Sequence, residues 1–236
     1  MNNPKPIKLF ATASHPCSYL DGKEAKTIFV DPEHIVDEQC YFELNRLGFR
    51  RSGSHFYRPQ CTSCQACIPT RLDVSRFKPS RSQKRTLKIN QDLQIRECIS
   101  IEDFDKHYEL FEKYIRLRHS DGDMYPAHTQ QFQEFINDNN FNTYFTEFWL
   151  GEQLVGVSVK DRLIDGWSAI YTYFDPDRSK RRLGAFAILN MIQSAQANLL
   201  NFVYLGYWIE DAPKMNYKID YQPLELFIDE RWQAFR

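Results

Sequence analysis

The stretch TYFTEFWLGEQLVGVSVKDRLIDGWSAIYTYF, residues 143–174, decides how this chain is expected to fold. It holds three runs rich in β-branched and aromatic residues, separated by the short turns Gly151-Glu152 and Asp165-Gly166. Runs of this kind joined by tight turns predict strands that form an antiparallel meander. A sheet is therefore expected at the centre of the second half of the chain.

Helical patterns flank these strands. Before them, Ser100 and Asp103 resemble a capping box, and apolar side chains then recur at spacings of three and four residues, which is typical of an amphipathic helix. The apolar positions are Ile101, Phe104, Tyr108, Phe111 and Ile115. The elements expected after the strands are a helix at 181–200, a buried strand at 201–209, a short helix at 214–218 and a strand at 224–228. Near the N-terminus, Asp31-Pro32 predicts a helix start and Gly48 a helix stop.

This order of elements is that of a GNAT-like acyltransferase domain, so the fold class expected is α+β. Residues 1–98 are expected to form a small, cysteine-containing N-terminal domain, and residues 99–236 a GNAT-like mixed α/β catalytic domain. In that architecture the helix after the third strand offers free backbone N–H groups to phosphate. The segment RSKRRLGAF suits this place because Gly184 lets backbone approach closely, while Arg181 and Arg182 add charge. A solvated basic turn is the commoner explanation for such residues.

Composition and charge narrow the function classes. The 236 residues include 30 basic and 31 acidic side chains, so only a local cluster of basic residues could bind nucleic acid. The N-terminal segment lacks the apolar core of a signal peptide, and no run approaches the roughly 20 apolar residues of a membrane span. We therefore expect a cytoplasmic monomer without membrane contact, whose six cysteines are reduced thiols or metal ligands rather than disulfides.

Two adjacent stretches in the first half of the chain carry candidate chemistry. The segment YRPQCTSCQACIPTR, residues 57–71, holds Cys61, Cys64 and Cys67 at C-x-x-C-x-x-C spacing. From Arg71 to Asn90 the chain has seven basic residues and one acidic residue. The first pattern is typical of a metal or redox site, and the second of a phosphate-binding surface.

Seven segments carry a more specific signal. They are HPCSYL (15–20), GFRRSG (48–53), YRPQCTSCQACIPTR (57–71), FKPSRSQKR (77–85), RHSDGDM (118–124), DGWSAIYTYFDPD (165–177) and YLGYWIEDAPKMNYK (204–218). In this order, over nearly the whole chain, they resemble the bacterial aspartate/glutamate leucyltransferases, relatives of the eukaryotic arginyl-tRNA–protein transferases. The resemblance implies transfer of leucine from leucyl-tRNA to the α-amine of proteins that begin with Asp or Glu, which creates a degradation signal of the N-degron pathway.

Two interpretations of the cysteines stay open. With Cys17, the three thiols make a four-sulfur set, enough for tetrahedral zinc or an iron–sulfur cluster. The eukaryotic relatives carry a further cysteine where Leu20 stands, so one ligand position implied by the resemblance is lost here. The alternative is a set of half-buried thiols that pack a small domain. The transfer reaction itself requires no cofactor, because an aminoacyl ester is already activated.

A leucyl-tRNA donor needs a surface that binds phosphate, and the basic stretch is the candidate. The residues expected to bind tRNA are Arg76, Arg81, Lys84 and Arg85, with Arg181, Arg182 and Gly184 at the phosphate-facing helix start. The alternative is a solvated connector between two domains.

The chemistry needs a group that accepts one amine proton and donors that stabilise the oxyanion. The candidates for this group are Tyr171, Tyr173, Asp175, Tyr207 and His119. Core packing explains Tyr171 and Tyr173 equally well, because their side chains share one strand face. His119 has the alternative of closing the helix that ends near Arg118.

The acidic side chain of the acceptor requires a cationic partner, ideally a bidentate arginine. Arg50 and Arg51, on the loop expected after the first helix, are the first candidates, and Arg58 and Arg71 are the next. About half of these arginines are expected to be ordinary surface residues. The leucyl side chain needs an apolar pocket, for which the candidate walls are Trp167, Phe174 and Trp208.

Other functions fit part of the pattern. A CoA-dependent N-acetyltransferase fits the second domain but does not explain the N-terminal domain and the basic stretch. A zinc-dependent nucleic-acid-binding module fits the cysteines but does not explain the GNAT-like domain. Arginine as the transferred residue is a closer alternative, because leucine and arginine transferases share most of the motifs. Leucine is expected because the cysteine-rich segment and RHSDGDM resemble the bacterial proteins.

Overall fold

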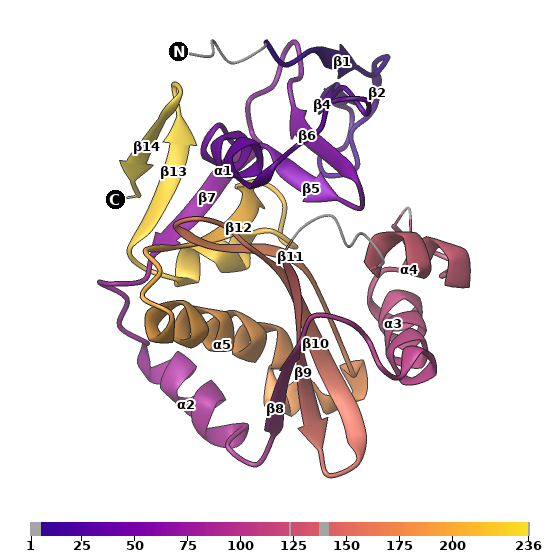
Figure 1. Ribbon diagram of the computed structural model, residues 1–236, viewed down its shortest axis with the longest axis vertical. Helices are drawn as coiled ribbons and strands as arrows, with labels where there is room; N and C mark the ends of the chain where they lie inside the picture. Colours follow the sequence, from indigo (N-terminus) through magenta and orange to yellow (C-terminus); the bar gives the residue numbers. More distant parts are fainter. Residues whose placement is uncertain (1–5, 123, 137–141, 236) are drawn as a thin grey trace.

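The computed structural model describes residues 6–122, 124–136 and 142–235, and one mixed sheet of eight strands lies at its centre (Figure 1). The strand order is β14–β13–β7–β12–β11–β10–β9–β8. Every neighbouring pair is antiparallel except β11 with β12, which run parallel. The strands are β7 (Ile68–Asp73), β8 (Gln94–Cys98), β9 (Thr143–Leu150), β10 (Gln153–Arg162), β11 (Gly166–Phe174), β12 (Phe202–Trp208), β13 (Leu224–Ile228) and β14 (Arg231–Ala234).

The three strands expected within residues 143–174 are β9, β10 and β11, so this prediction is confirmed. The first turn falls at Gly151, whose φ of +59° is a conformation that favours glycine. β10 is buried at every position from Leu154 to Asp161. A strand covered on both faces has this pattern, because neither set of alternate side chains meets water.

Helices cover both faces of the large sheet (Figure 1). On one side lie α3 (Phe104–Arg118) and α4 (Thr129–Ile136), and α3 packs on β10 and β11. On the other side lies α5 (Leu183–Ala197), the helix expected at 181–200, with α2 (Arg81–Ile89) packed against it. Two short 3-10 helices follow β11 and β12, namely η1 (Pro176–Arg181) and η2 (Asn216–Asp220). None of the described helices is long and apolar enough to cross a membrane.

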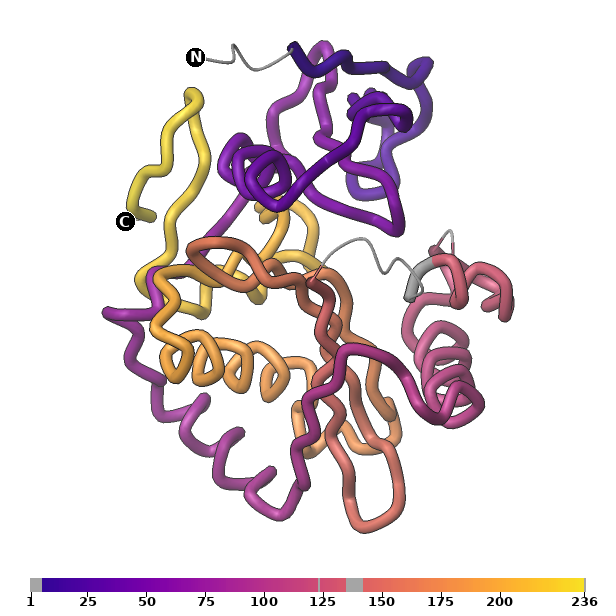
Figure 2. Tube along the Cα trace, viewed as in Figure 1, coloured from indigo at the N-terminus to yellow at the C-terminus, as the bar shows by residue number. Residues whose placement is uncertain are grey.

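A smaller sheet forms the N-terminal part of the protein. Its order is β1 (Leu9–Ala11), β4 (Thr27–Val30), β6 (His55–Pro59) and β5 (Arg50–Ser52), beside α1 (Glu38–Arg46) and the two-residue pair β2 (His15–Pro16) and β3 (Glu24–Ala25). In the chain trace this indigo part lies over one end of the large sheet (Figure 2). Leu44 of α1 and Phe56 of β6 share one apolar cluster with Tyr204 of β12 and with Leu163, which lies between β10 and β11. The two parts therefore bury a common core.

The large sheet takes strands from both halves of the sequence. β7 pairs with β12 and β13, and β8 pairs with β9, although both strands precede residue 99. The division expected between residues 98 and 99 therefore does not separate the two sheets, since the smaller sheet ends with β6 at Pro59. The sequence patterns above did not indicate these two strands, the short strands before them, β14, α2 or α4.

Two expected helix starts are wrong. α1 begins at Glu38, because the Asp37 side chain accepts a hydrogen bond from the Cys40 N–H at 2.7 Å. Asp31 instead accepts a hydrogen bond from the Glu33 N–H within a turn. Likewise α3 begins after Asp103, which caps it, and not at Ser100. The expected helix stop is confirmed, since Gly48 follows α1 with a φ of +81°.

The parallel strands β11 and β12 separate soon after they meet. Their backbone pairing covers only Gly166–Ser168 and Phe202–Tyr204, although both strands continue beyond it. β12 turns toward β7 at an irregularity around Gly206. From Ala169 onward, β11 therefore presents backbone groups toward this separation, which lies beneath the N-terminal sheet.

Candidate functional site

Two adjacent arginines on β5 reach the large sheet and end in different environments. Arg51 forms a bidentate ion pair with Asp161 of β10, with Nε–Oδ2 and Nη2–Oδ1 distances of 2.6 and 2.7 Å. Both side chains are buried, and Tyr41 and Thr143 also donate hydrogen bonds to this carboxylate. This arginine therefore fastens the N-terminal sheet to β10, and its charge is already matched.

Arg50 enters the separation between β11 and β12. It is 7% exposed, and its guanidinium donates to the Ser168 hydroxyl at 3.1 Å and to the Ala169 carbonyl. Across the described ranges, no carboxylate lies within ion-pair distance of it and its Nε–H has no acceptor. Its charge is buried without a matching anion, which is costly unless a ligand supplies one.

Gly206 leaves one edge of this guanidinium uncovered. A Cβ built on Gly206 would lie 3.6 Å from Arg50 Nε and 3.9 Å from Nη2, so any side chain there would cover both. These two nitrogens form the edge with which Arg51 holds Asp161. The backbone of β12, with a φ of +83° at Gly206, therefore places no side chain against this edge of Arg50, of which Nη2 donates to the Ala169 carbonyl and Nε keeps its hydrogen without an acceptor among the described residues.

A second buried cation lies close to Arg50. Lys218 of η2 is 3% exposed, and its Nζ is 3.2 Å from the thioether sulfur of Met215, a weak acceptor. Burial, and then the charge of Arg50, lower the pKa of Lys218 to about 7. In the part of the chain that the structure describes, Lys218 has no acidic partner. No local pattern indicated Lys218 as a site residue, because burial of a lysine depends on tertiary structure; its segment indicated only a short helix and the family resemblance.

Tyrosines form the walls around these cations. Burial raises the pKa values of Tyr57 and Tyr207 while the charge of Arg50 opposes this, which places both rings near the guanidinium. Tyr207 donates its hydroxyl hydrogen to the Gly48 carbonyl at 2.9 Å. Half-exposed Tyr217, on η2 beside Lys218, closes the group. Tyr207 therefore acts as a wall in this structure, because its one O–H is already used.

Two other candidates for the amine base are engaged in internal contacts. Tyr173 is fully buried, its hydroxyl 2.7 Å from His107 Nδ1, and His107 Nε2 is 3.0 Å from a Glu147 oxygen. Asp175 caps η1 and pairs with Lys113 at 2.6 Å and Arg178 at 3.1 Å. Although burial raises the pKa of Asp175, these hydrogen bonds outweigh it and the net pKa is lowered. Both groups have structural roles that are visible in their partners.

His119 and Tyr171 lie at the end of α3. His119 is half-buried, and its Nε2 is 3.1 Å from the hydroxyl of Tyr114, whose ring lies 6.3 Å from that of Tyr171. Burial, then the charges of Lys214 and Arg118, lower the pKa of His119. Its imidazole is therefore neutral at neutral pH and can accept a proton.

The remaining substrate-binding candidates have other partners than Arg50 has. Arg71 pairs with Glu225 at 2.7 Å and stacks between the rings of Phe202 and Trp232, which joins β7 to the C-terminal hairpin. Arg58 donates to the Leu47 carbonyl at 2.8 Å. The expected leucyl-pocket walls are dispersed: Trp167 and Trp208 lie in the core under α5, and Phe174 packs on Gly184. Since Ser168 contacts Arg50, the adjacent Trp167 points to the opposite face of the sheet.

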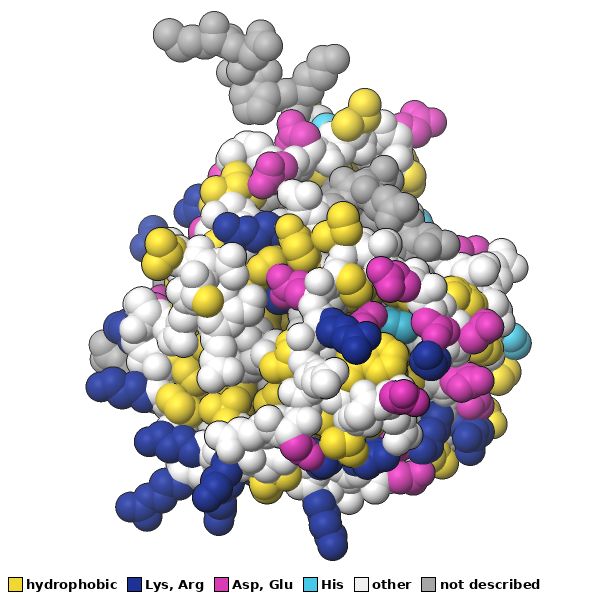
Figure 3. Space-filling view, turned by 60° about the horizontal axis from the view of Figure 1, so that its bottom comes forward, with side chains coloured by type: hydrophobic (Ala, Val, Ile, Leu, Met, Phe, Trp, Pro, Cys, Tyr) yellow, Lys and Arg dark blue, Asp and Glu magenta, His cyan; other side chains and the backbone are white. Residues whose placement is uncertain are grey.

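α2 presents a stripe of exposed cations. Arg81, Lys84, Arg85 and Lys88 recur at spacings of three, one and three residues, so they lie on one helix face, which we call the basic stripe. The structure shows no ion pair for any of them within its described residues. Figure 3 shows Lys and Arg side chains gathered on the corresponding left and lower edge of the molecule. Lys88 was not among the residues expected to bind tRNA.

The neighbouring arginines are partly neutralised. Arg76 pairs with Asp73 at 2.7 Å. Arg181 holds Asp92 through two hydrogen bonds of 2.7 and 2.8 Å. Arg182, exposed at the start of α5, donates to Ser82 of α2 and so extends the basic stripe toward Gly184. Of the residues expected to bind tRNA, those on α2 and Arg182 thus keep their charge available.

The four cysteines expected as metal ligands gather at the start of β7. All are half-buried free thiols. Burial and then the charges of Cys61, Cys17 and Cys64 raise the pKa of Cys67 to about 12, so the other three lie around it. Four soft sulfur donors suit zinc or an iron–sulfur cluster. Within the described ranges, however, no three His, Cys, Asp or Glu side chains are arranged to hold one ion.

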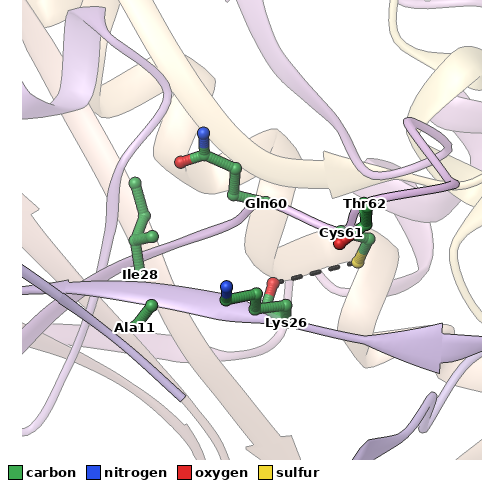
Figure 4. Close-up of a pocket in the computed structure, with 6 residues that line it drawn as sticks. All are labelled: Ala11, Lys26, Ile28, Gln60, Cys61 and Thr62. Atoms are coloured by element: carbon green, nitrogen blue, oxygen red, sulfur yellow. Dashed lines mark hydrogen bonds between the residues drawn. The ribbon is translucent and has the colours of Figure 1, made fainter. Parts of the chain in front are cut away.

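A cavity of about 330 Å³ opens beside this group, on the N-terminal sheet (Figure 4). Its lining residues are Ala11, Lys26, Ile28, Gln60, Cys61 and Thr62. Cys61 forms one wall, and its thiol lies 3.8 Å from the Lys26 carbonyl. The lining contains neither of the buried unmatched cations, so this cavity is distinct from the Arg50 site.

The described structure has two regions of positive charge without acidic partners. One is buried, at Arg50 and Lys218, and the other is exposed, on the basic stripe. This arrangement is expected of a protein that binds two anionic partners. Comparison with known proteins gives the family. The family described as arginine-tRNA-protein transferase, N terminus, matches residues 15–85, and its C-terminus counterpart matches residues 106–228. This chain belongs to the arginine-tRNA-protein transferase family.

Relatives within this family are close in sequence. A protein of Saccharophagus degradans is 51% identical over 97% of both chains, and one of Teredinibacter turnerae is 52% identical over 96% of this chain and 93% of that one. Both carry the name aspartate/glutamate leucyltransferase. Among solved structures, L-PGS from Bacillus licheniformis aligns with 62% of this chain and 46% of its own at 9% identity and a TM-score of 0.46.

Proposed function

We propose that this protein transfers leucine from leucyl-tRNA to the α-amine of proteins that begin with aspartate or glutamate, creating an N-degron for proteolysis. Relatives at 51% and 52% identity over nearly the whole chain are named for leucyl transfer and for these two residues. The structural observation that carries the proposal is Arg50, a buried guanidinium whose charge no described residue matches. An acidic side chain is the ligand that such a group binds best.

The reaction is attack of a neutral α-amine on the ester carbonyl carbon of the donor. A C–N bond forms, the C–O bond to the terminal ribose breaks, the amine loses a proton and the ribose oxygen gains one. An α-amine has a pKa near 7.7–8, so a useful fraction is neutral at cytosolic pH. The proposal requires no metal, ATP or covalent enzyme intermediate, because the ester is already activated.

His119 is the proton acceptor in this proposal. Its lowered pKa keeps the imidazole neutral, and its contact with Tyr114 fixes the ring. Tyr173, Asp175 and Tyr207 are held by internal partners, whereas His119 contacts Tyr114 through Nε2 only and its other ring nitrogen has no partner among the described residues, which supports His119 over them. A general base of this kind typically contributes 10²- to 10⁴-fold to the rate.

The acceptor carboxylate binds Arg50 rather than Arg51. Arg51 uses both nitrogens of its fork to hold Asp161, whereas the same edge of Arg50 faces Gly206 and has no carboxylate among the described residues: its Nε–H has no acceptor there, and its Nη2 donates to the Ala169 carbonyl. The donor tRNA binds along the basic stripe and Arg182, where cations have no acidic partner in the described structure and can release counterions on contact with phosphate.

The proposal includes a GNAT-like architecture for residues 99–236. Three antiparallel strands, then a helix and a strand parallel to the third, support it, as does the separation of β11 from β12 beside the site. We also propose that the protein is a monomer and acts in the cytoplasm, because leucyl-tRNA and the N-termini of new proteins are both present there. Equilibrium sedimentation tests the oligomeric state.

A transfer assay tests the function. Leucyl-tRNA and arginyl-tRNA are paired with peptides that begin with Asp, Glu, Asn or Lys, and the product is read by mass. Leucine should be transferred to the Asp and Glu peptides. Arg50→Ala should lose this preference over Asn, Arg50→Lys should restore it partly because lysine lacks the fork, and Arg58→Ala should behave like wild type. Faster transfer of arginine than of leucine would overturn the choice of donor.

The cysteine group is proposed as a structural metal site. Its support is the gathering of four sulfur donors around Cys67 beside the first residue of β7. A bound zinc ion or cluster would tie the N-terminal segment to a central strand, and no step of transfer passes through it. Elemental analysis of anaerobically purified protein tests this. Less than a tenth of an equivalent of zinc or iron would refute it.

A further inference from the structure

Lys218 differs from the other fully buried lysine of the described chain. Lys160 of β10 contacts the carboxylate of Glu97 and the hydroxyl of Ser194, so its charge is matched. Lys218 contacts the thioether of Met215 and lies 4.5 Å from the centroid of the Tyr217 ring, but it has no carboxylate within the described residues, and the charge of a second cation, Arg50, acts on it. Two buried positive charges without an anion repel each other, and an anion bound between them would stabilise both.

We propose that Lys218 is a specificity-determining residue of the acceptor site, which shares the Asp or Glu carboxylate with Arg50 and takes up a proton when that carboxylate binds. This rests on the proposed function, since the carboxylate is that of the acceptor. Arg50 comes from β5 and lies against Gly206 of β12, while Lys218 comes from η2, which packs on the same strand, and the charge of Arg50 acts on Lys218. The acceptor would thus be held from two sides.

The charges around Lys218 make its protonation depend on the ligand. Lys218 lies on η2 with Tyr217 and Asp220; η2 packs against β12, which carries Tyr207, and the charge of Arg50 of β5 acts on Lys218. This charge adds to the effect of burial, giving Lys218 a pKa of about 7. A carboxylate bound beside the ammonium stabilises the charged form. Above pH 7, binding of an acidic acceptor should therefore draw a proton from solvent.

Calorimetry tests the proton uptake without catalysis. A peptide that begins with Asp is titrated into the full-length protein, without tRNA, at pH 8 in buffers with different ionisation enthalpies. Wild type should take up close to one proton per peptide bound, and Lys218→Met should take up none. Lys106→Met, at an exposed lysine on α3 paired with Asp103, should match wild type. Equal uptake in wild type and Lys218→Met would overturn the proposal.

Steady-state kinetics separates this role from a purely structural one. With leucyl-tRNA saturating, Lys218→Met should raise the KM for an Asp peptide by about 30-fold or more and change the KM for an Asn peptide less than twofold. Lys218→Arg should recover most of the loss and should reduce the change in KM between pH 7 and 9 to the part caused by titration of the acceptor α-amine. A uniform fall in kcat for both peptides would overturn the proposal. Failure of wild type to transfer leucine to any peptide would instead refute the proposed function.

Discussion

Two contacts between the N-terminal sheet and the large sheet use the same chemical group in opposite ways. At one, Arg51 meets Asp161 in a complete, buried ion pair. At the other, one residue earlier on β5, Arg50 meets hydroxyl and carbonyl oxygens, and its charge acts on a second buried cation, Lys218. The first contact closes the fold by itself. The second leaves two positive charges that the described residues do not match, so the fold bears a cost that an acceptor can relieve.

The same contrast holds elsewhere in the molecule. Lys160 has Glu97 while Lys218 has no carboxylate within the described structure. At the surface, Arg181 holds Asp92, whereas the four cations of the basic stripe show no ion pair in the residues described. Where a cation has its own carboxylate, its role is structural. The cations without one mark the two regions assigned to substrates.

The largest expected effect is that of Arg51→Ala. It leaves the Asp161 carboxylate buried without its partner, which should lower the free energy of unfolding by about 3–5 kcal/mol. Arg50→Ala removes hydrogen bonds without isolating an anion, so its cost should be about 1–3 kcal/mol. Urea unfolding of both variants measures the difference. If Arg51→Ala were no less stable than Arg50→Ala, the contrast between the two arginines would be wrong.

Lys218→Met should stabilise the protein while weakening its activity. The folded pKa of about 7 lies below the unfolded value near 10.4, so wild-type stability falls as pH drops from about 10 to 7. Lys218→Met has no lysine that titrates in this way. At pH 7 its free energy of unfolding should therefore exceed that of wild type by about 1–4 kcal/mol, and above about pH 11 the two should be equal. Urea unfolding at several pH values checks it. Lys160→Met should raise the free energy of unfolding by less, because Lys160 is paired with Glu97. An equal increase in the two variants would contradict the contrast between a paired and an unpaired buried lysine.

Replacing Arg81, Lys84 and Arg85 together by glutamine should weaken donor binding. Each phosphate contact contributes about 0.7–0.9 to the slope of log K against log salt, so the slope should fall by about 2–3. Leucyl-tRNA and arginyl-tRNA should weaken alike, because phosphate carries no identity, and the KM for Asp peptides should not change. Filter binding between 50 and 300 mM salt measures the slope. An unchanged slope would exclude the basic stripe from donor binding.

The sequence predicted those parts of the fold that depend on local pattern. Residues 143–174 show their strands because long apolar runs and turns are properties of neighbouring residues. The N-terminal sheet escaped prediction because its strands are three to five residues long, too short for a period to show. Strand β7 was not predicted because it lies where the cysteine segment meets the basic stretch. The residue types there indicated a metal or phosphate site and no strand pattern.

The candidate site was predictable only in part for a related reason. Arg50 and Arg51 are identical and adjacent, and only the position of Asp161, 110 residues later, distinguishes them. The burial of Lys218 depends on η2 lying against β12, which no local pattern reveals. The basic stripe, by contrast, was evident in outline, since its members lie within eight residues of one helix.

The smallest expected effect is that of Arg76→Gln. It tests, at the surface, the difference between cations that have an acidic partner and cations that have none. Arg76 is 61% exposed in its side chain and pairs with Asp73 three residues before it, so the variant should lose at most about 1 kcal/mol of stability. Its charge is already compensated, so the salt slope for leucyl-tRNA should change by less than 0.3 unit, well below the value for one phosphate contact. Asp73→Asn provides the matched test, because it frees Arg76 and should steepen the slope if phosphate lies within reach. A slope reduced by about one unit in Arg76→Gln would show that an ion pair with a neighbouring carboxylate does not remove an arginine from the donor surface.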